Sequence, residues 1–299
     1  MGVTQATSPP PRLRQGYGGQ AALGLHSAKR DGASAAAELH DRRRIWFARP
    51  LLRSAYADAW AQLAAFAAAG PSLEIGCGCG TLDGPPKSAE ERSHRTGPEP
   101  RQLPRCWKSD IVVLPWADLA ADALRLPVRN GALANILGTD VLHHLPRPLE
   151  FLAEAARALR PDGRLLLLEP YMSRLSYPVY RRLHHEPADL RRDPCDSTGA
   201  NQATPTLLFC RHPEVVASHV PQLEIIHCRP RDAVVYPLSG GYSYPALLPR
   251  FMEPWAWRVE RACGRLMPAI GFRLAIALRR KEVALPSRWD GNAIPEGDE

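Results

Sequence analysis

The feature that most restricts the fold of this chain is residues 73–80, LEIGCGCG, where a short apolar run enters a series of glycines. The run predicts a buried strand. Glycine at every second position lets the backbone turn sharply and approach a ligand closely, because no Cβ stands in the way. A dinucleotide fingerprint, G-x-G-x-x-G, would need its third glycine at Thr81 or Asp83. The segment therefore predicts a strand followed by a ligand-binding turn that is not the dinucleotide-binding turn.

The pattern along the rest of the chain alternates between short apolar runs and helical periodicity. Such alternation favours an open α/β sheet covered on both faces by helices. The predicted strands are residues 72–75, 107–113, 117–121, 133–139, 164–169, 223–228 and 272–278, and the predicted helices are 51–66, 148–159, 175–185, 213–219 and 254–266.

Four further motifs follow the glycine turn in a fixed order: KSD at 108–110, ADA with LP at 121–127, DVLHHLP at 140–146 and RALRPDGRLL at 157–166. Together with the E-x-G-x-G-x-G turn, this set resembles class I S-adenosylmethionine-dependent methyltransferases, in particular the methyltransferase-11-like domain. The resemblance covers about residues 72–170. It implies an α/β, Rossmann-like methyltransferase fold with a mostly parallel, doubly wound sheet and a last antiparallel strand.

The same resemblance implies S-adenosyl-L-methionine as cofactor and a set of residues around it. The glycine turn would surround the methionine half, Asp110 would hold the ribose hydroxyls, the pair Asp122 and Ala123 would lie near adenine, and Asp140 would border the cofactor and the acceptor. The residues of the turn are Glu74, Gly76, Cys77, Gly78 and Gly80.

Each of these assignments has a structural alternative. Glu74 could cap backbone N–H groups at the end of its strand. Asp110 and Asp122 could form Asx turns, in which a side chain bonds to its own backbone two residues on. Cys77 and Cys79 are expected to fill the loop, because C-x-C alone matches no common metal or redox site.

Histidines supply the candidates for a general base. An imidazole near neutral pH can take a proton from an acceptor hydroxyl, and His144 and His185 are the catalytic candidates, with packing beside the cofactor or in a loop as the alternatives. Asp140, His143 and His144 have the spacing of a metal site, but Mg²⁺ prefers oxygen ligands. No metal is expected.

The chain is predicted to hold one catalytic domain. Residues 1–40 are rich in Gly, Ala, Pro and Gln and predict a disordered extension, followed by a methyltransferase domain over residues 41–282. Within it, the Pro-rich residues 83–105 predict an irregular insertion, and residues 171–211 and 230–266 predict elements of a lid over the acceptor. Residues 283–299 predict a disordered tail.

Charge and cysteine content exclude several classes of protein. The net charge is +7, but residues 1–53 contribute +6 of it, and so nucleic acid is not an expected partner. Seven cysteines, without zinc-ligand spacing, fit a cytoplasmic protein better than a disulfide framework. The sequence contains no run of about 18 apolar residues, so no transmembrane segment is predicted. The helix containing Trp255 and Trp257 is expected to pack on the core, with peripheral membrane contact as the alternative.

The predicted function is transfer of a methyl group from S-adenosylmethionine to a small-molecule or glycan acceptor, with a hydroxyl as the expected target. Two alternatives stay open. One is a non-catalytic binding or scaffold protein that keeps the fold, and the other is a nicotinamide-dependent oxidoreductase, against which the missing third glycine argues.

Overall fold

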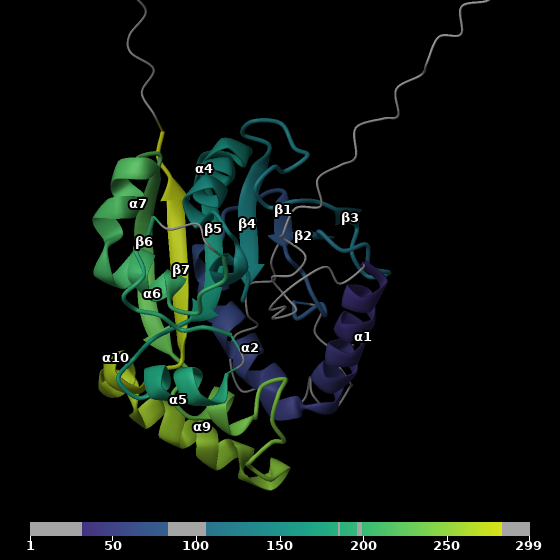
Figure 1. The fold of residues 1–299 in the computed structure, drawn as a ribbon, viewed down its shortest axis with the longest axis vertical. Coiled ribbons are helices and arrows are strands. Elements are labelled where there is room, and N and C mark those ends of the chain that lie inside the picture. The colour runs from purple at the N-terminus through teal and green to yellow at the C-terminus, as the bar shows by residue number, and fades with distance from the viewer. Residues whose placement is uncertain (1–31, 83–105, 185, 196–198, 283–299) are drawn as a thin grey trace, which may run out of the picture.

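The computed structural model describes residues 32–82, 106–184, 186–195 and 199–282. Its centre is a seven-stranded sheet in the order β3-β2-β1-β4-β5-β7-β6 (Figure 1). Neighbouring strands are parallel, except that β7 is antiparallel to both β5 and β6. This confirms the predicted fold class, a doubly wound sheet with a last antiparallel strand. The strands are β1 (Ser72–Ile75), β2 (Cys106–Asp110), β3 (Leu119–Ala120), β4 (Leu133–Thr139), β5 (Leu159–Pro170), β6 (Leu223–Arg231) and β7 (Arg273–Arg280).

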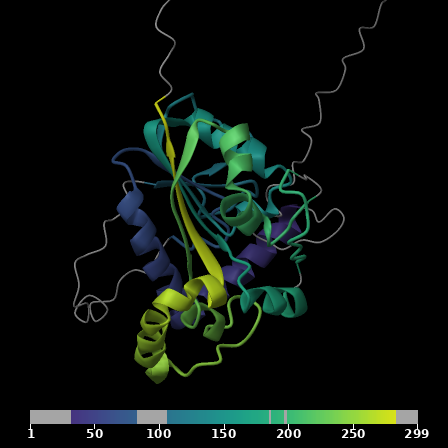
Figure 2. The same cartoon turned by 90° about the vertical axis from the view of Figure 1, so that its left-hand side faces the viewer.

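Helices cover both faces of the sheet (Figure 2). On one face, α2 (Pro50–Leu63) packs against the strands, and on the other face α4 (Pro148–Ala158) and α7 (Pro213–His219) do so. Residues of β5 alternate between the two layers, as side chains of a strand must. Leu165 and Leu167 join the α4 layer, whereas Leu166 and Leu168 join the α2 layer.

A group of shorter helices lies beyond the carboxyl ends of the parallel strands, where ligands bind in open α/β sheets. Figure 1 shows α5, α9 and α10 together at the end of the molecule toward which β4 points. The helices of this region are α5 (Ser176–Leu183), α6 (Thr204–Thr206), α8 (Val235–Leu238), α9 (Glu253–Ala262) and α10 (Met267–Ile270), with single turns at η3 (Leu142–His144), η4 (Leu207–Arg211), η5 (Arg250–Met252) and η6 (Gly264–Leu266).

The N-terminal boundary of the folded part differs from the prediction. Helix α1 (Gly32–Ala48) begins inside residues 1–40, which were expected to lack regular structure. The reason is that Leu39 is fully buried in a small cluster with Ala35, Cys77 and Leu114, a contact that no local pattern indicates. Residues 1–31, 83–105 and 283–299 lie outside the described residues, so the predictions made for them stay predictions.

Several elements are shorter than expected, among them the strand predicted at 117–121, which is only Leu119–Ala120. The strand predicted at 107–113 ends at Asp110, because the Asp110 carboxylate accepts the N–H of Val112 and turns the chain. The helix predicted at 254–266 ends at Ala262, and a turn at η6 follows. The helix predicted over 51–66 is formed by α2, and its last turn is the separate 3-10 turn η2 (Ala64–Phe66).

Candidate functional site

The glycine turn after β1 has the close backbone path that its sequence predicts. Gly76, Gly78 and Gly80 have φ angles of 55°, 51° and 77°, the left-handed region that glycine adopts without strain. A Cβ on Gly76 would lie 2.7 Å from Cγ2 of Val141, so only glycine fits between the turn and the segment after β4. The N–H of Cys77 bonds to the carbonyl of Ser109 at 2.9 Å, which ties the turn to β2.

Asp110, predicted to hold the ribose, forms hydrogen bonds to the backbone of the glycine turn and of its own loop. One carboxylate oxygen accepts the N–H of Gly78 at 2.9 Å, and the other accepts the N–H of Val112 at 3.0 Å, as an Asx turn would. The side chain is buried, and burial raises its pKa although both backbone hydrogen bonds act in the opposite direction. Contact between Asp110 and a sugar stays a prediction.

The remaining predicted cofactor residues divide into two groups. Gly76, Cys77, Gly78 and Asp140 line the large cavity described below. Glu74, Gly80, Asp110, Asp122 and Ala123 are absent from the described residues that line it. Asp122 accepts the N–H of Leu124 at 2.9 Å in an Asx turn, the alternative stated above, and Ala123 packs in the main core.

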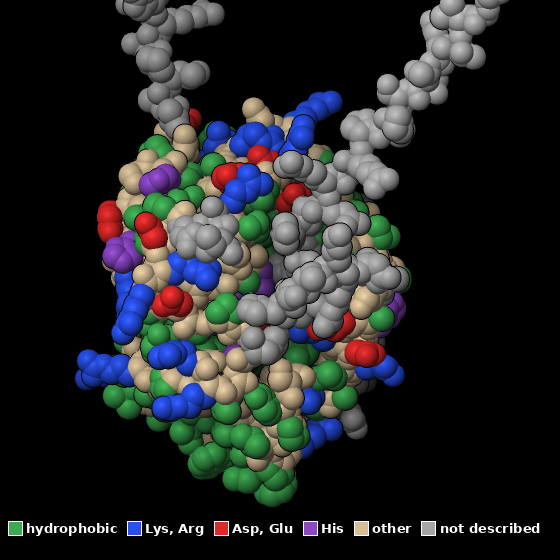
Figure 3. All heavy atoms as spheres, viewed as in Figure 1, with side chains coloured by type: hydrophobic (Ala, Val, Ile, Leu, Met, Phe, Trp, Pro, Cys, Tyr) green, Lys and Arg blue, Asp and Glu red, His purple; other side chains and the backbone are tan. Residues whose placement is uncertain are grey.

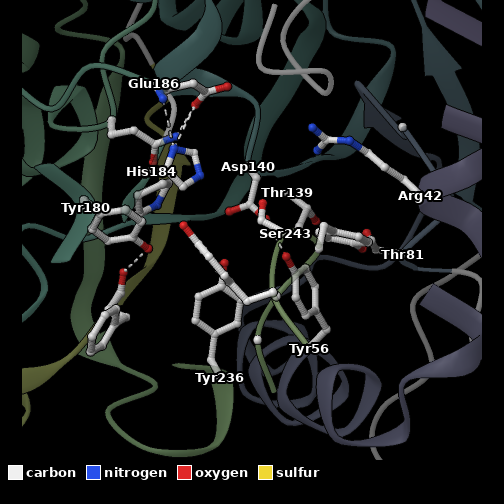
Figure 4. Close-up of a pocket in the computed structure, with 18 of the residues that line it drawn as sticks. Arg42, Tyr56, Thr81, Thr139, Asp140, Tyr180, His184, Glu186, Tyr236 and Ser243 are labelled. Carbon is white, nitrogen blue, oxygen red and sulfur yellow. Dashed lines mark hydrogen bonds and ion pairs between the residues drawn. The ribbon is translucent and has the colours of Figure 1, made fainter. Parts of the chain in front are cut away.

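A cavity of about 570 Å³ lies at the carboxyl ends of β1 and β4. One side is formed by the glycine turn and Arg42 of α1, and the other by α5, by Glu186 and by the segment from Tyr236 to Leu247. Figure 4 shows Asp140 near the middle, with Arg42 and Thr81 on one side of it and His184, Glu186 and Tyr180 on the other. The cavity thus contacts the predicted cofactor turn and both predicted lid segments.

The lid segment also contacts the glycine turn directly. Tyr242 and the sulfur of Cys79 form a hydrogen bond of 3.2 Å, and Arg49 donates to the carbonyl of Gly241. Burial raises the pKa of the Cys79 thiol to about 11, so it is protonated at neutral pH. This agrees with its expected role as a loop filler.

Asp140 is held by two elements that the sequence did not connect to it. Its φ of 52° turns the chain away from β4, and its carboxylate accepts the hydroxyl of Tyr56 at 2.7 Å. Arg273, at the start of β7, donates to both carboxylate oxygens at 3.1 and 3.2 Å. The Arg273 side chain is fully buried and lies over the rings of Tyr56 and Tyr236.

A cluster of histidine and glutamate forms the wall of the cavity opposite the turn. His143 donates from Nδ1 to Glu169 at 2.7 Å, and its Nε2 lies 3.7 Å from Glu186. Burial opposes the charged form of His143, but hydrogen bonds to Glu169 and Glu186 outweigh it and raise its pKa to about 10. Burial raises the pKa of Glu186, but the hydrogen bond to His143 and the charges of the neighbouring histidines lower it by more. The pKa of Glu186 therefore lies well below its usual range.

His144, a predicted catalytic residue, lies beside this charged cluster. Its Nδ1 is 3.5 Å from Glu186, and its ring centre lies 3.9 Å from that of His143, with the two ring planes tilted by 37°. Burial, with a contribution from charged His143, lowers the pKa of His144 well below its ordinary value. The imidazole is therefore neutral at neutral pH and can accept a proton. His185, the other catalytic candidate, lies outside the described residues.

The sequence segments 184–187 and 200–206 meet at this wall. Asn201 donates its backbone N–H to the carbonyl of His143 at 2.8 Å, and the amide of Gln202 donates to Glu186. The Oε1 atom of Gln202 is buried and has no hydrogen-bond partner among the described residues. Gln202 lines the cavity, so a ligand there could donate to this oxygen.

Three of these side chains could also hold a metal ion. His143, His144 and Glu186 each offer one ligand atom, and the three atoms lie within 4.8 Å of one another. Two imidazoles and one carboxylate suit a borderline ion such as Zn²⁺ better than Mg²⁺. However, Glu169 and Glu186 already stabilise a proton on His143. The positive charge of this imidazole therefore offsets carboxylate charge in the cluster without a metal ion.

Sequence reasoning missed Arg273, Glu169, Glu186 and the hydroxyl of Tyr56 as parts of the site. Arg273 could have been noticed, because it is a charged residue inside the apolar run of the last strand and a buried charge needs a partner. Glu169 likewise ends the apolar run of β5, where its carboxylate accepts the N–H groups of Val141 and Leu142. Glu186 lies in residues 171–211, which were predicted only as part of the lid. Tyr56 lies in the helix predicted over 51–66, for which no role in the site was predicted.

Residues 73–167 match the protein family described as methyltransferase domain. This match agrees with the family that the ordered motifs indicated and with the expected cofactor, S-adenosylmethionine. No curated protein matches the chain.

Several solved structures are similar to the chain at low identity. A methyltransferase of Haloferax volcanii in complex with the Trm112 activator is 15% identical, with 86% of this chain and 100% of that chain covered and a TM-score of 0.43. An S-adenosylmethionine-dependent methyltransferase from Thermotoga maritima is 14% identical (81% and 99% covered, TM-score 0.43). Geranyl diphosphate C-methyltransferase from Streptomyces coelicolor is 13% identical (75% and 77% covered, TM-score 0.39). With scores this low, the fold assignment rests on the strand order.

Among the described residues, no helix combines the length and the apolar character that crossing a membrane requires.

Proposed function

We propose that the chain transfers a methyl group from S-adenosylmethionine to a hydroxyl of a small-molecule or glycan acceptor. The observation that carries this proposal is that one cavity has Gly76 and Gly78 on one side of its wall and Tyr180, His144 and Glu186 on the other. Donor and acceptor could therefore meet in the same cavity.

The residues on the donor side fit the cofactor. The turn at Gly76 leaves no room for a Cβ, so its backbone can lie directly against a ligand. When bound, S-adenosylmethionine supplies a methyl group already activated by a positively charged sulfur. The carboxylate of Asp140, part-exposed in the cavity wall, is suited to accept hydrogen bonds from the cofactor.

The residues on the acceptor side would orient and deprotonate the hydroxyl. Neutral His144 would take the hydroxyl proton as the oxygen attacks the methyl carbon, and the electron pair of the broken C–S bond would remain on sulfur. Glu186 would stabilise the resulting imidazolium, since it lies 3.5 Å from Nδ1. Alignment of acceptor and methyl group can itself remove roughly 7–11 kcal/mol of a barrier in favourable cases.

The two alternative functions make different predictions. A non-catalytic scaffold would bind the cofactor, or nothing, without turnover. An oxidoreductase would bind a nicotinamide cofactor, which the family match of residues 73–167 disfavours.

Incubation of the full chain with S-adenosylmethionine and fractionated metabolites, read by mass spectrometry, tests the proposal. We expect S-adenosylhomocysteine to accumulate together with a product one methyl group heavier than a component of one fraction. Binding without any such product would favour the scaffold function, and oxidation of NADH in its place would favour the oxidoreductase.

A further inference from the structure

Exposed hydrophobic side chains are concentrated on α5, on α9 and on the segments next to them. Ten large hydrophobic residues are exposed in the described part of the chain, and seven of them lie between residues 175 and 266. Figure 3 shows hydrophobic side chains gathered over the end of the molecule where Figure 1 places α5, α9 and α10. We call these residues the apolar face: Leu175, Leu183, Tyr244, Leu247, Phe251, Trp255 and Leu266.

Helix α9 presents part of the apolar face because Ala256 and Glu260 are its buried residues. Glu260 is buried, and its carboxylate accepts the N–H groups of Ala233, Val234 and Val235 at 2.8–2.9 Å. This anchor fixes the rotation of the helix. Trp255, expected from the sequence to pack on the core, is 49% exposed as a result, and Phe251 one turn earlier is 82% exposed.

Positive charge accompanies the apolar face. Residues 174–183 and 244–266 contain seven arginines, all exposed, and two acidic residues, Glu253 and the buried Glu260. The arginines are Arg174, Arg181, Arg182, Arg250, Arg258, Arg261 and Arg265. Exposed apolar side chains beside arginines are the composition of segments that lie in the interface of an anionic lipid surface.

The apolar face also reaches the mouth of the cavity. Leu183, Tyr244 and Leu247 are exposed and line the cavity at the same time. The hydroxyl of Tyr244 donates to the carbonyl of Leu183, which joins α5 to the segment between α8 and α9 at this rim. A surface covering the apolar face would therefore lie against the rim of the cavity.

We propose that the apolar face docks on an anionic lipid surface, with the rim of the cavity against the lipid. A second copy of the chain is a poorer occupant, because two such faces would bring seven arginines against seven arginines. The consequence for the acceptor rests on the proposed function. The methyl acceptor would be a molecule carried by the lipid, and it would enter the cavity directly from the lipid, without crossing water.

Co-sedimentation of the full chain with vesicles tests the docking without cofactor or acceptor. The vesicles are phosphatidylcholine alone and phosphatidylcholine mixed with phosphatidylglycerol. The apolar variant is Phe251→Ser/Trp255→Ser, and the charge variant is Arg258→Gln/Arg261→Gln. Val113→Ser is the matched control, because Val113 is 80% exposed but lies outside the apolar face.

We expect the wild type and Val113→Ser to bind the anionic vesicles and to be released by salt, and each double variant to bind at least tenfold more weakly. Absence of vesicle binding, equal binding to neutral vesicles, or a wild-type dimer that Phe251→Ser/Trp255→Ser converts to a monomer would overturn the proposal. Because these measurements use no S-adenosylmethionine, their failure is distinct from failure of the proposed methyl transfer.

Discussion

The guanidinium of Arg273 and the carboxylate of Asp140 form a pair with N–O distances of 3.1 and 3.2 Å, which connects the start of β7 to the end of β4. The Arg273 side chain is buried, whereas that of Asp140 is part-exposed in the cavity wall. The pair therefore places the last, antiparallel strand in direct contact with the predicted cofactor site.

Arg273→Met should destabilise the protein. The variant leaves Asp140 without its cation and removes the group lying 4.0 Å from the ring centre of Tyr56. Loss of one partner of a fully buried pair costs about 3–5 kcal/mol; because the Asp140 side chain is 30% exposed, we expect a smaller loss than this, but one larger than that for an exposed pair. Urea denaturation measures this change. Arg279→Met, on the same strand but in an exposed pair with Glu224, is the control and should change stability little. Equal effects of the two variants would show that the buried pair has no special weight.

The charge on His143 should make the folded protein sensitive to mildly alkaline pH. Its pKa is about 10 when folded and 6.5 when unfolded, so between these values the folded state holds a proton that the unfolded state has lost. This contribution is complete below pH 6.5 and declines as pH rises toward 10. We expect urea midpoints to fall from pH 6.5 to pH 9 in the wild type, and the slope to be absent in His143→Gln. A wild type whose midpoints stay constant over this range would contradict the charge assignment.

His144→Ala should reduce turnover more than it reduces cofactor binding, because the proposed role of this imidazole begins with the acceptor proton. The low pKa of His144 also predicts no inflection near pH 6.5 in the rate. His219→Ala, an exposed histidine of α7, serves as the control. Parallel losses in kcat and in affinity for S-adenosylmethionine would make His144 a packing residue, which was the structural alternative.

Removal of divalent metals should leave methyl transfer unchanged. Glu169 helps to keep His143 protonated, and a protonated imidazole has no free ring nitrogen to bind a metal ion. Activity before and after dialysis against EDTA, with metal content read by mass spectrometry, checks this expectation. A loss of activity that Zn²⁺ alone restores would instead identify the histidine–glutamate cluster as a metal centre.

The sequence predicted the fold and the glycine turn because both are local. A strand entering glycines, apolar runs and helix stops are visible within a few residues, and the resemblance carried by the ordered motifs implied a mostly parallel sheet with a last antiparallel strand. Asp140 and His144 follow β4 directly, so their position at the cavity could also be predicted.

The rest of the site depends on contacts between distant parts of the chain. Arg273 meets Asp140 across 133 residues, and Glu186 meets the histidines only because Asn201 and Gln202 fold back onto them. Asp110 illustrates a different limit. Its motif indicated a ligand, and that stays a prediction, but nothing local to the motif indicated that its carboxylate also accepts the N–H of Gly78. Motif position cannot say whether such a carboxylate faces the backbone or the cavity.

The most direct test of the account is isothermal titration of the full chain with S-adenosylmethionine, for the wild type, Gly76→Ala and Gly264→Ala. A Cβ at Gly76 would collide with Val141 at a φ of 55°, whereas a Cβ at Gly264 meets no atom within 4 Å. We predict micromolar binding by the wild type and by Gly264→Ala, and at least tenfold weaker binding by Gly76→Ala. No binding by the wild type, or binding of NADH alone, would contradict the assignment of this cavity to methyl transfer.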